Sequence, residues 1–175
     1  SVGLYAAALG IGYNTKMLAR KHLSEPRCWT DLARPEYHDD VQIANPLSSS
    51  GAYVTLATLV QVFGEDKAFE LLKGVHRNVK LYPRAVNGPI RAVARGETAI
   101  GVAFLHDVAT EIANGFPVGL AVPCEGTGYE VGAMSVVRGA PHPAHARRFY
   151  DWALSPATQR IAFEVGPVGE ERAAA

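Results

Sequence analysis

The chain has 175 residues, enough for one domain with a sizeable hydrophobic core, and no apolar run reaches the length that crosses a bilayer. Apolar residues make up 48% of the sequence, and its 17 Lys and Arg residues balance 17 Asp and Glu residues. This composition excludes a disordered segment and a broad basic surface, so we expect a globular domain with no nucleic-acid partner.

The first part of the chain alternates between strand and helix patterns. Residues 2–13 have the apolar composition of a β-strand, and residues 14–22 fit a short helix. Residues 41–44 form a short apolar run typical of a buried strand. Three serines then precede apolar residues spaced by three and four, which predicts a helix that ends at Gly64. A second helix follows over residues 65–75, with acidic residues in its opening turn, where the helix dipole favours them.

The same alternation continues to the end of the chain. Strand patterns occupy residues 79–82, 98–104, 118–122 and 131–137, and helix patterns occupy residues 89–95, 108–113, 144–154 and 156–165. Alternating strands and helices predict an α/β domain in which helices pack on a mixed, mostly parallel sheet.

We expect a single domain over residues 1–165. The chain begins directly with a strand pattern rather than with a leader sequence, as a fragment or an excised lobe of a larger protein would. Residues 166–175 are rich in Gly, Ala and charged residues, which predicts a flexible tail.

Polar residues follow the second apolar strand and lead into a helix. Hydroxyl groups and free backbone N–H groups converge here, where Ser49, Ser50 and Gly51 open the predicted helix. Such a helix start binds an anion without any basic side chain, because the amides and the helix dipole supply the positive potential. The alternative is a simple N-cap in a serine loop, and the sequence fits both interpretations equally.

Two further polar segments follow apolar strands. His106 and Asp107 follow the strand pattern of residues 98–104. The imidazole suits a phosphate or hydroxyl, and the carboxylate suits a sugar hydroxyl or an ammonium group. The alternative, favoured by spacing alone, is that Asp107 caps the next helix and His106 lies half exposed beside it. Glu130 ends a glycine-containing loop over residues 123–130 and also suits hydroxyls or a cation, unless the loop is an ordinary tight connection.

The sequence contains no motif for catalysis or for a cofactor. A nucleophile elbow, a P-loop and a dinucleotide fingerprint are all missing, so we expect neither an enzyme nor a cofactor. Cys28 and Cys124 lack the spacing of a zinc or redox motif and say little about the cellular compartment. A metal site is a weak alternative for the His and acidic residues above, and we predict none. Trp29 and Trp152 are expected to anchor the core.

Together these segments resemble one family, the periplasmic binding proteins of the ferric-iron transporter type and their relatives that carry phosphorylated sugars or phosphonates. The resemblance covers nearly the whole chain and rests on the order and spacing of several stretches. These are GIGYN (10–14), CWTDL (28–32), PEY (35–37), IANPLSSSGAY (43–53), LVQVFGEDKA (59–68), ARGETAIGVAFLHD (94–107), PCEGTGYEVGAMSVVRGA (123–140) and FYDWALSPATQ (149–159).

The resemblance implies the second lobe of a type II periplasmic-binding-protein fold, a three-layer α/β lobe that closes on a solute together with a first lobe. It also implies an extracytoplasmic component of an ABC transporter, placed in the periplasm or outside the cell. The implied partners are a small anionic solute, the membrane permease and the first lobe, which is missing from this chain. The ligand-sensing domain of a receptor is an alternative, because one fold serves many functions.

By the same resemblance, residues 49–51 occupy the helix start that holds the anion, where the family usually has Ser-Gly-Thr. His106 and Asp107 stand where ferric-binding members have adjacent tyrosines that ligate iron. The resemblance therefore favours a phosphorylated sugar or a phosphonate as the solute, with a ferric-iron-binding protein as the alternative. Asp107 and Glu130 are expected to accept hydrogen bonds from the hydroxyls or the amine of the solute, with His106 near the anion.

Overall fold

The computed structural model describes residues 1–164 and divides the chain into two compact units. The larger unit comprises residues 8–130, and the smaller unit comprises residues 1–7 and, among the described residues, residues 131–164. A single lobe over residues 1–165 stays a prediction. The predicted flexible tail over residues 166–175 lies outside the described residues.

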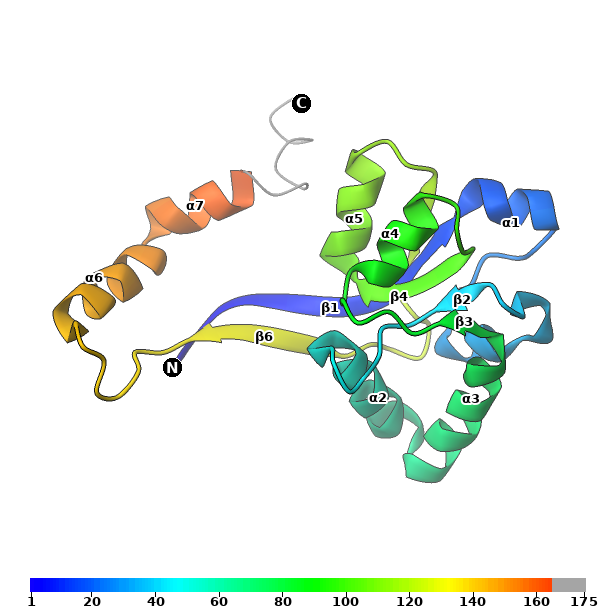
Figure 1. Cartoon of the computed structure of the whole chain (residues 1–175), viewed down its shortest axis with the longest axis horizontal. Helices are drawn as coiled ribbons and strands as arrows, with labels where there is room; N and C mark the ends of the chain where they lie inside the picture. Colours follow the sequence, from blue (N-terminus) through cyan, green and yellow to red (C-terminus); the bar gives the residue numbers. More distant parts are fainter. Residues whose placement is uncertain (165–175) are drawn as a thin grey trace. The chain divides into compact units, whose positions relative to one another are not determined.

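Strands and helices alternate along the chain as the sequence patterns predict (Figure 1). The elements are β1 (Val2–Asn14), α1 (Thr15–Lys21), the 3₁₀ turns η1 (Trp29–Ala33) and η2 (Pro35–Tyr37), β2 (Val41–Gln42), α2 (Ser50–Phe63), α3 (Glu65–Asn78), β3 (Val79–Leu81), α4 (Gly88–Ala94), β4 (Ile100–Phe104), α5 (Leu105–Ala113), β5 (Val118–Ala121), β6 (Tyr129–Met134), α6 (Pro143–Ala153) and α7 (Pro156–Glu164).

Two element boundaries differ instructively from the predictions. Helix α5 begins at Leu105 rather than at residue 108, because Phe104 has an extended backbone and passes directly into the helix without a loop. Strand β6 covers residues 129–134 rather than 131–137. Because β6 is held by pairing with β1, its limits follow the partner strand and not the apolar run in its own sequence.

The strands form one mixed sheet with the order β3-β2-β4-β1-β5, and β6 pairs with β1 outside this path. Strand β2 runs parallel to β3 and β4, whereas β1 runs antiparallel to β4 and β5. Along the path, β1 is therefore the strand that opposes the others, which confirms a mixed, mostly parallel sheet. Because β2 and β4 are parallel neighbours, their carboxyl ends meet at the same edge of the sheet.

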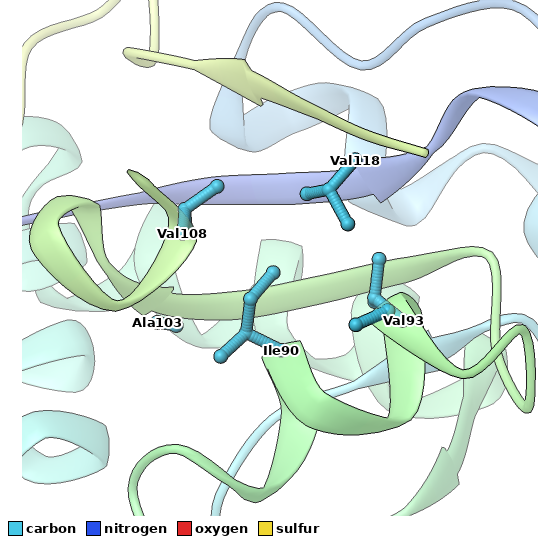
Figure 2. Close-up of a cluster of buried hydrophobic side chains, with 6 residues drawn as sticks. Ile90, Val93, Ala103, Val108 and Val118 are labelled. Carbon is cyan, nitrogen blue, oxygen red and sulfur yellow. The ribbon is translucent and has the colours of Figure 1, made fainter. Parts of the chain in front are cut away.

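Helices cover both faces of the sheet in the larger unit, which confirms the three-layer arrangement (Figure 1). Helices α4 and α5 lie on one face, and α2 and α3 lie on the other. Figure 2 shows the apolar cluster beneath α4 and α5, which joins side chains of both helices to those of β4 and β5. Its members include Ile90, Val93, Ala103, Val108 and Val118, each at most 8% exposed.

The smaller unit contains α6 and α7, and its aromatic side chains are exposed. Trp152 of α6 is 55% exposed and contacts Phe149, with ring centroids 5.4 Å apart. The prediction that Trp152 anchors the core is therefore wrong within residues 1–164, since none of the described elements of this unit buries it.

None of the described helices is long and apolar enough to cross a membrane.

Candidate functional site

The loop between β2 and α2 is fastened by Asn45. Its carboxamide oxygen accepts from the N–H of Leu47 at 2.9 Å, and its carbonyl accepts from the N–H of Ser48 at 3.0 Å. The hydroxyl of Ser48 lies 3.3 Å from the carbonyl oxygens of Asn45 and Arg84, so it donates within the loop and to the segment before α4. These bonds fix the approach of the chain to the first turn of α2.

The three predicted residues at the start of α2 have different roles. Ser49 is buried and caps the helix, with its hydroxyl accepting from the N–H of Ala52 at 3.4 Å. The backbone N–H groups of Ser50 and Gly51 have no acceptor within residues 1–164, as expected for the first turn of a helix. The capping and anion-binding interpretations are therefore compatible, because Ser49 supplies the cap and its two neighbours keep free donors.

The start of α2 packs against an aromatic ring at the end of β4. A methyl group added at Gly51 would lie 3.0 Å from Cε2 of Phe104 and 2.6 Å from Cγ2 of Val86, so only glycine allows this approach. The ring of His106 also stacks on Phe104, with centroids 5.5 Å apart and an angle of 11° between the planes. One buried phenyl ring thus brings the α2 start and His106 to the same region.

Asp107 does not cap α5, and the alternative interpretation of this residue is wrong. The N-cap position belongs to Phe104, so Asp107 lies in the first turn of the helix, where a negative charge is favourable. Its side chain is 24% exposed, and its Oδ1 lies 3.6 Å from Nε2 of His106. Within residues 1–164 its carboxylate accepts no hydrogen bond.

Glu130 lies on β6 and is half buried. Gly128, just before β6, lies so close to α2 that a methyl group there would collide with Oγ1 of Thr58. Within the described part of the chain Glu130 makes no hydrogen bond or ion pair.

A disulfide in the loop before β6 was missed by the sequence analysis. Cys28 and Cys124 are bonded across 96 positions of sequence. The only signal available was the even number of cysteines, which is weak because pairing depends on distance in the folded chain. Bonded sulfurs offer no thiolate, so the close grouping of these cysteines with Glu125 does not make a metal site in the oxidised protein.

Glu125 is a second residue that the sequence analysis missed. Its carboxylate accepts from the N–H of Trp29 at 2.8 Å and from the N–H and hydroxyl of Thr30 at 3.0 and 2.9 Å. Partial burial opposes ionisation and is the largest single influence, but the hydrogen bonds outweigh it and lower the pKa of Glu125. Trp29 itself is 1% exposed, which confirms the prediction that it anchors the core.

An apolar cavity of the larger unit does not coincide with these polar groups. It has a volume of about 490 Å³ and lies between α2 and α3, where its walls are mostly apolar. It shares Asn45 and Ala52 with the start of α2, but it contains neither His106 nor Glu130. An apolar lining is unsuited to a phosphorylated sugar, so the candidate site remains the polar edge where β2 and β4 end.

Comparison with known proteins matches nearly the whole chain to one family. The sequence profile of the bacterial extracellular solute-binding proteins matches residues 1–174. An uncharacterized protein of Haemophilus influenzae is 49% identical over 164 residues, which cover 93% of this chain and 47% of that protein.

Solved structures show the same fold. The periplasmic binding protein AfuA from Actinobacillus pleuropneumoniae, with exogenous fructose-6-phosphate bound, is 43% identical and has a TM-score of 0.89 over 94% of this chain and 52% of its own. The periplasmic binding protein P5PA is 35% identical, with a TM-score of 0.86 over 92% and 51% of the two chains. Iron-bound HitA from Pseudomonas aeruginosa, 20% identical with a TM-score of 0.75, covers 94% and 54% and shares the fold alone. This chain spans about half the length of these relatives.

Proposed function

The chain belongs to the bacterial extracellular solute-binding proteins, and from this we propose that it is one lobe of such a protein and binds a small organic anion. The solute is a phosphorylated sugar or a phosphonate, held in a cleft that a first lobe completes. The bound solute passes to the membrane permease of an ABC transporter, and the lobe catalyses no reaction. The Cys28–Cys124 disulfide supports an oxidising location such as the periplasm, because disulfides persist there.

The observation that carries this proposal is a set of unengaged polar groups, at the start of α2, in the first turn of α5 and on β6. Two free amides open α2, and the carboxylates of Asp107 and Glu130 accept no hydrogen bond within residues 1–164. Donors at a helix start suit a phosphate, whereas carboxylates suit sugar hydroxyls. The fructose-6-phosphate bound to the 43% identical AfuA supports the same class of solute.

Each side chain then has a separate role. The phosphate or phosphonate lies at the N–H groups of Ser50 and Gly51, beside the Ser49 cap. His106, kept in place by the ring of Phe104, donates to the anion or to a hydroxyl. Asp107 and Glu130 accept from the hydroxyls or the amine of the solute. A ferric site receives less support, since residues 106 and 107 offer an imidazole and a carboxylate and no phenolate.

The proposal is tested by titrating the 175-residue chain, followed by NMR, with fructose 6-phosphate, fructose, methylphosphonate and ferric citrate. We expect fructose 6-phosphate to bind with a dissociation constant of about 1 mM, equivalent to about 4 kcal/mol, because one lobe supplies one wall of the cleft. Fructose without phosphate should bind far more weakly. Equal binding of the two sugars, or a coloured ferric complex in preference to both, would contradict the proposal.

Variants of the two carboxylates sharpen this test. Asp107→Ala and Glu130→Ala should each weaken fructose 6-phosphate binding about tenfold, because each removes hydrogen bonds to a charged acceptor. Glu70→Ala on the exposed face of α3 is the matched control and should leave binding unchanged. A large fall in melting temperature for Asp107→Ala or Glu130→Ala would show that these residues are structural instead.

A further inference from the structure

We propose that Glu125 and the Cys28–Cys124 disulfide are positioning elements that hold Glu130 in place for the solute. They act by clamping the loop of residues 124–128, which leads directly into β6. The proposal rests on the solute-binding role assigned to Glu130 above, and it adds a reason why that carboxylate has a defined location.

The first attachment of the loop is covalent. Cys124 is bonded to Cys28, and its backbone N–H also donates to the carbonyl of Arg27 at 2.9 Å. Both contacts tie the loop to the segment just before η1. That segment is itself ordered, because the carboxylate of Asp31 accepts from the N–H groups of Arg27 and Cys28 at 2.8 and 3.0 Å.

The second attachment is the Glu125 carboxylate at the start of η1. Both of its oxygens are used, one by the N–H of Trp29 and the other by the N–H and hydroxyl of Thr30. The indole Nε1 of Trp29 returns a hydrogen bond of 2.9 Å to the carbonyl of Gly126. Because Trp29 is almost fully buried, this bond fixes Gly126 to a side chain that is unable to move with the loop.

The third attachment joins the loop to the sheet. The hydroxyl of Thr127 donates to the carbonyl of Leu9 at 2.9 Å, and the N–H of Leu9 donates to the carbonyl of Gly128 at 3.0 Å. Gly128 also lies so close to Thr58 of α2 that a side chain would not fit. The end of the loop is thus held against β1 and against the helix whose start carries the free amides.

These attachments leave no free residue between the disulfide and β6. Each residue from Cys124 to Gly128 has a bond to another segment, and Glu130 follows two positions later. The carboxylate of Glu130 therefore has a backbone that is fixed relative to α2. Without Glu125 the loop keeps its covalent bond but loses the contacts that orient it, so Glu130 samples positions that do not serve the solute.

A double-mutant cycle on the 175-residue chain separates this role from general stabilisation. Glu125→Ala should weaken fructose 6-phosphate binding roughly fivefold, within the range of coupling between neighbouring groups. In the Glu130→Ala background the same substitution should have little further effect, because the side chain that it positions is already missing. Thr30→Val removes one of the three bonds to Glu125 and should show a smaller loss with the same dependence on Glu130.

A second measurement reports on the loop without any ligand. The amide hydrogen of Leu9, bonded to Gly128, should exchange with solvent roughly tenfold faster in Glu125→Ala, and also in the wild-type chain after its disulfide is reduced. Cys124 is exposed, so the reductant has access to the bond. Glu70→Gln removes an exposed carboxylate of α3 and should change neither the exchange at Leu9 nor the affinity.

The outcomes distinguish the two proposals. Losses of affinity that are not additive in the double-mutant cycle, together with faster exchange of the Leu9 amide hydrogen, support the positioning role of Glu125. If Glu125→Ala lowers the affinity equally in the wild-type and Glu130→Ala backgrounds, the positioning role is overturned and the solute site stays intact. If Glu130→Ala does not change the affinity, the solute-binding role of Glu130 is wrong and the positioning role falls with it, even if Leu9 exchanges faster in Glu125→Ala.

Discussion

The phenyl ring of Phe104 lies flat against the imidazole of His106, with the two ring planes inclined by only 11°. The same phenyl ring packs against Gly51 at the start of α2. Phe104 is 6% exposed, so it is a fixed surface between a donor-bearing helix start and an ionisable side chain. In our account this ring determines how far the anion lies from the imidazole.

Replacing Phe104 by leucine should therefore reduce affinity with only a modest loss of stability. Loss of the aromatic contact is worth about 0.5–1.5 kcal/mol, which corresponds to about a two- to tenfold weaker binding of fructose 6-phosphate. The free energy of unfolding should fall by less than about 1.5 kcal/mol, because leucine fills most of the volume. Titration and urea unfolding measure the two effects, with Phe69→Leu on α3 as the exposed control. Unchanged affinity would show that the ring does not organise the site.

Gly51→Ala should destabilise the fold, although glycine-to-alanine changes usually stabilise helices. The added methyl group would press on Val86 and Phe104, and overpacking of this kind costs about 1–3 kcal/mol. Ser50→Ala is the control, because its side chain is exposed and should alter stability by less than about 0.5 kcal/mol. Urea unfolding provides the comparison. Stabilisation by Gly51→Ala would mean that α2 does not approach the ring so closely.

Replacing both cysteines by serine should lower the free energy of unfolding by about 2–5 kcal/mol, as for other native disulfides. The bond closes a long loop, with its cysteines 96 positions apart, so the unfolded chain gains much freedom when it is removed. Thermal unfolding of the oxidised chain and the Cys28→Ser/Cys124→Ser variant measures the difference. Equal melting temperatures would show that the other contacts of the loop suffice alone.

Stability should depend on pH through Glu125. Its pKa is lower in the folded protein than in the unfolded chain, so its ionised form stabilises the fold above the unfolded pKa of about 4.3. That contribution is lost as the pH falls through the lower, folded pKa. The stability difference between wild type and Glu125→Gln should therefore be largest near neutral pH and should shrink below about pH 4. A difference that grows in acid would contradict the assigned sign.

Local sequence patterns were sufficient to predict most of the helices and strands. The period of α2 and its serine start predicted the helix, and Gly64 predicted its end. The boundaries of β6 were less accurate, because they depend on pairing with β1, whose residue Leu9 is more than a hundred positions away. Strand limits of this kind are set by the partner strand and not by local composition.

The candidate site was predictable only in part. The rule that ligand groups follow the carboxyl ends of parallel strands selected residues 49–51, His106 and Asp107, and the structure brings two of them, Gly51 and His106, against the ring of Phe104. The ring itself was not predicted, because Phe104 looks like an ordinary apolar residue at the end of a buried strand. Likewise, the role of Glu125 depends on a contact with Trp29, 96 positions away in sequence.

A crystal structure of the chain with fructose 6-phosphate bound tests the central claim most directly. We predict phosphate oxygens within about 2.7–3.2 Å of the backbone nitrogens of Ser50 and Gly51, with sugar hydroxyls bonded to Asp107 or Glu130. A phosphate bound at any other place, with the α2 start facing only solvent, would contradict the account.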